Sequence, residues 1–323
     1  MALRSSPSVF LHHAKWPLRA ARRQCLGYWA KREAQIVKSA NKPRWSPIFI
    51  VGAPRAGTTL VYQSILASFK VSYFLNLVDR LPNSPGLVTR AICRLFSPSP
   101  PRSFESSFGE IKGLLAPSHG RHIWARWFPG DQGYVPAGFL AQEQMQEIRG
   151  TIATIERAFD LPFFNKAQGH CVRILPLHEA FPEAVYLRVS RDHLQTAQSL
   201  LLGRKRYFGD AKKWFSVKPK AYDRIARFEP CQQICEQLFE IEKDLDRDLG
   251  DVAAGRVFDL QYESFCSDPN GNMKRFQEFY ESVSGKKLVG RTPLPESFQV
   301  SSKQSANQSE YDELKFHIHR LWG

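Results

Sequence analysis

The sequence contains no long hydrophobic run. No stretch of its 323 residues approaches the roughly 18 consecutive apolar residues that a membrane-spanning helix needs. No apolar core of a secretory signal precedes the first polar segment either. These absences exclude an integral membrane protein of the helical type, and we expect a cytoplasmic location.

The cysteines form no C-x-x-C pair and have no His partner at a zinc-site spacing. Six are present, and two of them, Cys231 and Cys235, have the i, i+4 spacing of one helix face. This pattern excludes the common structural zinc sites and favours reduced thiols over a disulfide framework. We therefore expect no bound metal.

Acidic residues are scarce near the N-terminus. Residues 1–45 contain ten Lys or Arg and one acid, Glu33, and the whole chain has a formal net charge of +14. A nucleotide, an acidic glycan, a nucleic acid or a membrane surface would suit such a charge. We predict a basic N-terminal extension over residues 1–45, which either lies on an anionic membrane as amphipathic helices, forms a solvated arm or serves as an organelle transit peptide. One folded domain over residues 46–323 follows it.

Short apolar segments separated by helical stretches predict an α/β fold. Ile48–Val51 has the continuous hydrophobicity of a strand that is buried on both faces. Three further segments predict strands, and three longer ones predict helices. The strands are 162–165, 184–189 and 256–260, and the helices are 61–69, 141–159 and 311–321. Strands and helices that alternate in this way build a parallel sheet.

A glycine-rich turn joins the first strand to the first helix, without the lysine of a nucleoside-triphosphate loop. Thr58 stands where G-x-x-x-x-G-K-[ST] requires that lysine, which disfavours ATP with magnesium. The backbone N–H groups of Ala56, Gly57, Thr58 and Thr59 nevertheless converge at a helix start, and Arg55 adds a charged donor. We interpret the turn as a site for a single phosphate, the alternative being a Gly-Thr turn without a ligand.

The segment Pro54–Leu60 resembles the 5'-phosphosulfate loop of sulfotransferases that use 3'-phosphoadenosine 5'-phosphosulfate, abbreviated PAPS. The resemblance covers roughly residues 46–279. It implies a P-loop-like three-layer α/β fold with a central parallel sheet flanked by helices. It also implies a catalytic domain over 46–323, PAPS as co-substrate without a metal, and transfer of a sulfuryl group to a hydroxyl or an amine.

The same family binds the 3'-phosphate with an Arg at a later strand end and a Ser eight residues further on. Arg191 and Ser199 have this spacing, at a strand end where open α/β sheets bind ligands. Arg188 competes for the role, although strand alternation puts it on the opposite face from Arg191. Alternatively, Arg191 pairs with Asp192 or with a helix carboxylate, Ser199 is an ordinary helix residue, and neither binds a ligand.

For catalysis, the resemblance implies a lysine at a strand end that stabilises the leaving oxygen. Lys166 matches, although an exposed strand terminus explains it as well. Many relatives carry a His two residues later, where this chain has Gln168. We expect His119, which follows Pro117-Ser118, to act as the base. The alternatives are Glu105, Glu110, His122 and His170.

The stretch 106–129 resembles an acceptor-site region of bacterial-type carbohydrate sulfotransferases, which implies a glycan or glycolipid acceptor and no specific nucleic acid. Trp124 and Trp127 form either a wall for a sugar ring or part of the core. The resemblance also implies that Lys303 closes over the nucleotide and that the block 259–269, which looks like a late strand and turn of the family, is a structural marker. A P-loop kinase-like phosphotransferase and a non-catalytic polyanion-binding protein remain as alternative functions.

Overall fold

A four-stranded parallel sheet forms the centre of the computed structural model, which describes residues 27–101, 104, 111–128, 133–252, 255–300 and 304–323. The strand order is β4 (Phe164–Lys166), β1 (Ile48–Val51), β5 (Val185–Ser190) and β6 (Val257–Gln261). All three neighbouring pairs are parallel. The predicted α/β class is therefore confirmed.

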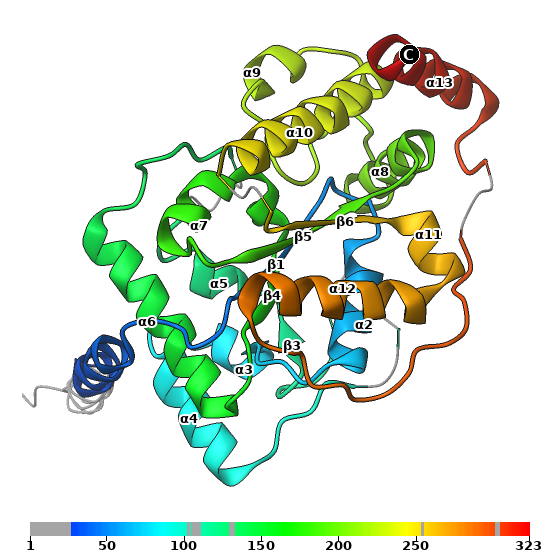
Figure 1. Cartoon of the computed structure of the whole chain (residues 1–323). Helices are drawn as coiled ribbons and strands as arrows, with labels where there is room; N and C mark the ends of the chain where they lie inside the picture. The colour runs from blue at the N-terminus through cyan, green and yellow to red at the C-terminus, as the bar shows by residue number, and fades with distance from the viewer. Residues whose placement is uncertain (1–26, 102–103, 105–110, 129–132, 253–254, 301–303) are drawn as a thin grey trace, which may run out of the picture.

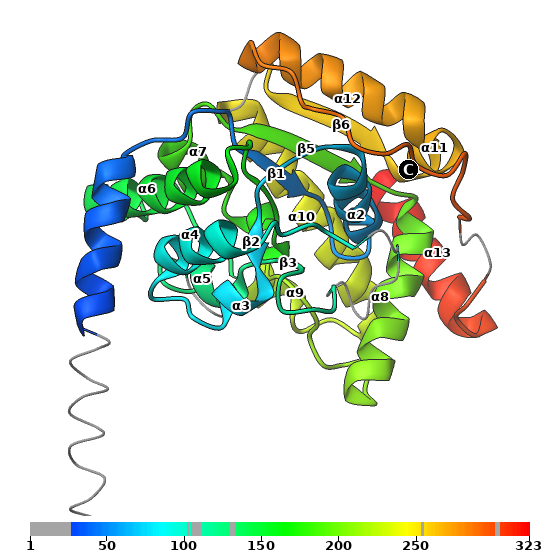
Figure 2. The same cartoon turned by 90° about the horizontal axis from the view of Figure 1, so that it is seen from below.

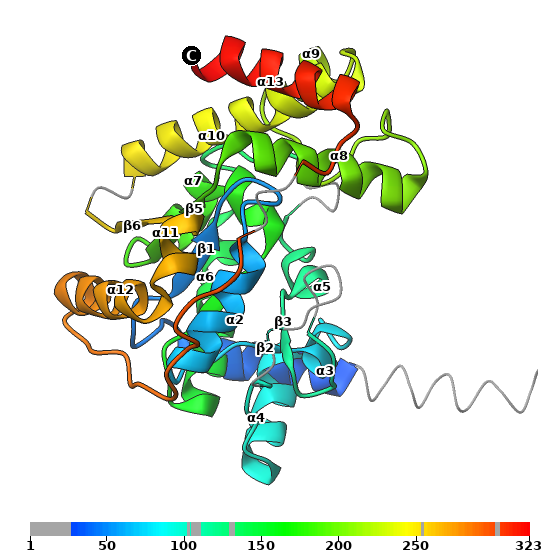
Figure 3. The same cartoon turned by 90° about the vertical axis from the view of Figure 1, so that its right-hand side faces the viewer.

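Helices cover both faces of this sheet and complete three layers (Figures 1 and 3). On one face α10 packs against α7, α8 and α13, while α2 and α12 contact the strands from the other. The bounds are α2 (Thr58–Ser68), α7 (Ile174–Ala180), α8 (His193–Phe208), α10 (Pro230–Val252), α12 (Pro269–Ser284) and α13 (Gln308–Trp322). Because both faces are covered, β1 is buried along its whole length.

A second, smaller assembly lies beyond the β4 edge. It contains an antiparallel pair of short strands and the helices around them. Its elements are β2 (Phe74–Leu75), α3 (Asn76–Asp79), α4 (Pro85–Leu95), β3 (Pro117–Ser118), α5 (Arg121–Trp124) and α6 (Gln142–Phe159). The remaining elements are the 3-10 helix η1 (Gln168–Val172), α9 (Tyr222–Ile225) and α11 (Tyr262–Ser267).

The predicted elements agree with the structure to within about three residues at their ends. The strand expected over 162–165 begins at Phe164, and the helix expected over 61–69 begins at Thr58, directly after the glycine-rich turn. The pattern did not predict the short strands β2 and β3, because elements of two residues carry no periodicity.

A helix over residues 27–40 packs against the body of the protein (Figure 2). The buried Glu33 carboxylate accepts hydrogen bonds from the backbone N–H groups of Gly86 (2.8 Å) and Leu87 (2.7 Å), at the beginning of α4. At its other end, Arg157 donates to the Ala40 carbonyl at 2.6 Å. Part of the predicted extension is thus docked, and the domain boundary at residue 45 remains a prediction.

None of the helices among the described residues combines the length and apolar character needed to cross a membrane.

Candidate active site

The glycine-rich turn leaves β1 at the carboxyl edge of the sheet and enters α2. Gly57 has φ 90° and serves as N-cap of α2, whose first turn contains no acidic residue and whose cap has no side-chain hydrogen bond. A Cβ atom on Gly57 would lie 2.1 Å from Cδ2 of Tyr262, so only glycine fits. Arg55 also has positive φ, at 70°, a conformation that costs a non-glycine residue about 1–3 kcal/mol and often marks functional positions. The helix start therefore suits an anion.

The structure joins the two predicted phosphate segments. Arg55 donates from Nε to the Ser199 Oγ at 3.0 Å, and Arg191 donates from Nη1 to the Arg55 carbonyl oxygen at 3.3 Å. These contacts connect residues more than 130 positions apart, from the turn after β1, the end of β5 and the middle of α8. Arg55, Arg191 and Ser199 therefore form one cluster.

Asp192, the acid that the sequence offers as an alternative partner of Arg191, lies at the beginning of α8. Its carboxylate caps α8 by accepting the N–H of Gln195 at 2.8 Å. The guanidinium of Arg191 lies over the ring of Tyr262, 4.8 Å from the centroid. Tyr262 thus contacts Arg191 and also lies against Gly57.

Arg188, the competing candidate, points to the other face of the sheet and forms ion pairs with Asp246 and Asp259. Its charge is therefore balanced within the protein. This pairing favours Arg191 as the phosphate ligand.

Lys166 ends β4 next to the turn, in register with Ile50 of β1. It is only 6% exposed, and no hydrogen bond or ion pair joins it to the described residues. Burial lowers the pKa of Lys166 to about 8, and the nearby charge of Arg55 acts in the same direction. Burial and, to a smaller extent, the charge of Arg191 also lower the pKa of Arg55. A concentrated positive charge of this kind is stabilised by an anionic ligand.

Gln168, at the position where a His was expected, supports the turn. Its Nε2 donates to the Gly52 carbonyl oxygen at 3.2 Å. The Gln168 amide therefore supports the backbone of the turn. It cannot replace a catalytic His, because an amide has no basic nitrogen.

His170 is fully buried and cannot act as the base. Its Nδ1 accepts hydrogen bonds from Arg173 (3.2 Å from Nε), and its Nε2 lies 2.7 Å from Oδ1 of Asn165. Burial, followed by the charge of Arg173, holds the pKa of His170 well below its usual value. The ring packs edge-on against Phe49 and Trp124, at 5.1 and 5.0 Å. It is a neutral core residue.

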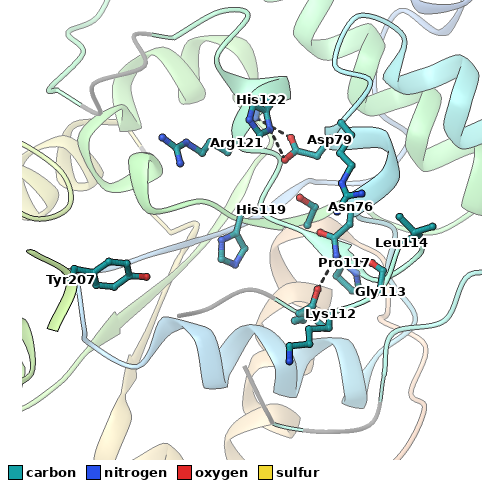
Figure 4. Close-up of a pocket in the computed structure, with 13 residues that line it drawn as sticks. Asn76, Asp79, Lys112, Gly113, Leu114, Pro117, His119, Arg121, His122 and Tyr207 are labelled. Atoms are coloured by element: carbon teal, nitrogen blue, oxygen red, sulfur yellow. Dashed lines mark hydrogen bonds and ion pairs between the residues drawn. The ribbon is translucent and has the colours of Figure 1, made fainter. Parts of the chain in front are cut away.

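His119 lines a pocket of about 780 Å³, shown in Figure 4. This volume falls in the range of small-molecule sites, roughly 300–1,000 Å³. The His119 carbonyl accepts a hydrogen bond from Nδ2 of Asn165 at 3.3 Å, and its ring packs edge-on against Tyr62 of α2 at 5.8 Å. Because Asn165 directly precedes Lys166, His119 belongs to the segment next to the end of β4.

The remaining base candidates fall in two groups. His122 is exposed at the rim of the same pocket, where Nδ1 lies 3.1 Å from Oδ2 of Asp79. Glu105 and Glu110 lie outside the described residues, as does Lys303.

Trp124 and Trp127 belong to the core, which decides between the two interpretations of their spacing. They are 2% and 4% exposed, and their indole N–H groups donate to Asn165 (3.0 Å) and Glu147 (2.9 Å). These two side chains therefore cannot form a wall against which a sugar ring stacks, because they are buried.

Tyr262 and Asn165 were not identified from the sequence as site residues. Asn165 accepts from Trp124 through Oδ1, which also contacts His170, and its Nδ2 holds His119. Tyr262 lies in the block 259–269, whose resemblance to the family could have indicated a site residue, but the sequence supports only its interpretation as a structural marker. Both side chains act by positioning neighbours from distant segments.

The described residues contain no group of three His, Cys, Asp or Glu side chains that could hold a metal ion. The cluster of Arg55, Lys166, Arg191 and Ser199 around a helix start instead has the donors that phosphate and sulfate groups require.

Comparison with known proteins agrees with this chemistry. The family model described as the sulfotransferase family matches residues 47–282. A sulfotransferase from Mycobacterium avium has 14% sequence identity and a TM-score of 0.50, over 94% of this chain and 74% of that one. A sulfotransferase from Mycobacterium tuberculosis H37Rv has 13% sequence identity and a TM-score of 0.48, over 92% of this chain and 82% of that one. No match was found among curated proteins. Since the family model covers most of the chain, the protein belongs to the sulfotransferase family.

Proposed function

We propose that this sulfotransferase takes its sulfuryl group from PAPS and transfers it to a hydroxyl group of a carbohydrate or glycolipid. The observation that carries the donor assignment is the contact of Arg55 with both Ser199 and Arg191. PAPS has phosphate groups on two sides of one ribose, so its binding needs two anion sites that are close together. The cluster supplies both.

On the donor side, the N–H groups at the start of α2 and the guanidinium of Arg55 bind the 5'-phosphosulfate. Arg191 and Ser199 bind the 3'-phosphate. Tyr262 keeps Arg191 in place through its ring.

Transfer is an in-line displacement at sulfur. The acceptor oxygen forms a bond to sulfur while the bond from sulfur to the bridging oxygen breaks. His119 takes the proton of the acceptor hydroxyl, and Lys166 stabilises the negative charge that gathers on the bridging oxygen. The products are the sulfate ester and adenosine 3',5'-bisphosphate, and no metal takes part.

Calorimetry with adenosine 3',5'-bisphosphate tests the donor site. We expect saturable binding to the wild-type chain that Arg55→Ala and Arg191→Ala weaken at least tenfold, because each removes a charge-assisted hydrogen bond. Arg188→Ala is the matched control and keeps the affinity, since that side chain is paired with Asp246 and Asp259. Tight binding of ATP with magnesium, without binding of the bisphosphate, would instead favour the kinase alternative.

Transfer itself is tested with radiolabelled PAPS and a cell extract separated into glycans, lipids and small molecules. Label in glycans or glycolipids is expected. The polyanion-binding alternative predicts no transfer and loss of binding on truncation. That truncation should remove residues 1–26 only, because the helix over 27–40 is docked through Glu33.

A further inference from the structure

The pocket beside His119 is lined by positive charge. Arg80 follows α3, Lys112 precedes β3, and Arg121 begins α5, so three separate segments each contribute a cation. Among the described residues, none of these three side chains has an ion-pair partner. Three unbalanced cations around one cavity repel one another, and an anionic occupant removes that cost.

Asp79 is the only acid that lines the pocket within the described residues, and its carboxylate is already engaged. It accepts the backbone N–H groups of His122 (2.9 Å) and Ile123 (3.3 Å) and contacts the imidazole of His122 at 3.1 Å. Its side chain is 13% exposed. Asp79 therefore holds the beginning of α5, and its single negative charge leaves the three cations in excess among the described lining residues.

The position of Lys112 is fixed by its neighbours. The Asn76 amide donates to the carbonyl oxygens of Ile111 and Gly113, both at 2.7 Å, on either side of Lys112 (Figure 4). Two such bonds hold the backbone of this segment against α3. A lysine on a pinned backbone presents its charge to the same cavity as Arg121.

Aromatic stacking, the usual means of holding a neutral sugar, has little part in this pocket. Trp124 and Trp127 are buried in the core, and Tyr207 is the one aromatic residue among the described lining residues. Charge is therefore the main recognition element that the pocket offers.

We propose that the acceptor is an acidic saccharide, a sugar that already carries a carboxylate or another anionic group, and that Lys112 and Arg121 bind that group. This inference rests on the proposed transfer to a carbohydrate. Such a sugar occurs either as a free glycan or as the headgroup of a glycolipid, and both present the same anion to the pocket.

The test compares two probes that differ only in charge. A glucuronate-containing hyaluronan tetrasaccharide and its carboxyl-reduced derivative are titrated into the full chain with adenosine 3',5'-bisphosphate bound. We expect the acidic probe to bind at least tenfold tighter, with an affinity that falls as salt increases. The double variant Lys112→Gln/Arg121→Gln abolishes that preference. Arg90→Gln/Lys213→Gln, which removes two exposed charges outside the pocket, retains it.

A second arm identifies the source of the anion, using phosphatidylcholine vesicles that contain glucuronosyl or glucosyl diacylglycerol. Preference for the charged lipid in co-sedimentation assigns the headgroup, whereas preference only among the tetrasaccharides assigns a free glycan. Equal binding or no binding of both probes in both arms overturns the proposal, as does a preference that persists in Lys112→Gln/Arg121→Gln. Binding of the bisphosphate alone is measured first, so failure of the donor assignment is seen separately.

Discussion

Replacing Lys166 by methionine is expected to stabilise the protein while removing its activity. The lysine is 6% exposed, and burial lowers its pKa from 10.5 to about 8. At about 1.4 kcal/mol for each tenfold change in proton affinity, this difference corresponds to about 3 kcal/mol of lost stability at pH 7. Methionine fills similar space without a charge, so Lys166→Met should gain up to that amount.

The sign of the pH dependence follows from the lowered pKa. Between pH 8 and 10.5 the unfolded chain holds a proton on Lys166 that the native protein has already released, so the contribution of Lys166 to stability rises with pH in that window. The advantage of Lys166→Met over wild type should therefore shrink by about 2 kcal/mol between pH 7 and pH 9.5.

Urea unfolding at both pH values, followed by tryptophan fluorescence, measures this difference, with the exposed Lys213→Met as control. In the same preparation, the transfer rate should fall by about 100- to 1,000-fold, as for the loss of one group that stabilises developing negative charge. The reasoning would be refuted by a Lys166→Met variant whose stability relative to wild type is the same at pH 7 and pH 9.5, or by one that retains full activity.

Three further changes test the remaining parts of the site. Gly57→Ala should destabilise the native state by about 1–3 kcal/mol and abolish calorimetric binding of adenosine 3',5'-bisphosphate, because its φ is 90° and its Cβ would collide with Tyr262. Tyr262→Leu should weaken that binding about 5- to 30-fold, since a cation–π contact is worth about 1–2 kcal/mol, whereas Tyr262→Phe should retain most of it. His119→Asn should lower kcat by about 100- to 10,000-fold with unchanged bisphosphate affinity, and an equal loss of affinity would show that His119 acts in donor binding instead.

The donor site could be predicted from the sequence because its parts are local. A buried strand, a glycine with positive φ and a helix start must follow one another directly to bring several N–H groups to one phosphate, so Gly57 and Thr58 are recognisable by their order alone. Arg191 and Ser199 have a spacing set by one strand end and one helix. Their contact with Arg55 depends on strand order, which places β5 next to β1.

The acceptor side offers no such local pattern. Its pocket gathers side chains from α3, the segment before β3, α5 and the end of α8, and no spacing rule relates these segments. Burial decided between the two interpretations of Trp124 and removed His170 from the candidates for the base, and burial depends on the packed structure rather than on neighbours in the chain.

Asn165 shows how the two sides are connected. It lies on β4 directly before Lys166. Its side-chain Nδ2 donates to the backbone carbonyl oxygen of His119, while its side-chain Oδ1 contacts His170 and Trp124 in the core. A buried side chain with all of these partners cannot rotate without breaking several hydrogen bonds. Asn165 thus links the backbone of His119, the proposed base, to the strand that ends in Lys166, the proposed leaving-group cation, although Asn165 carries no charge and takes no part in transfer.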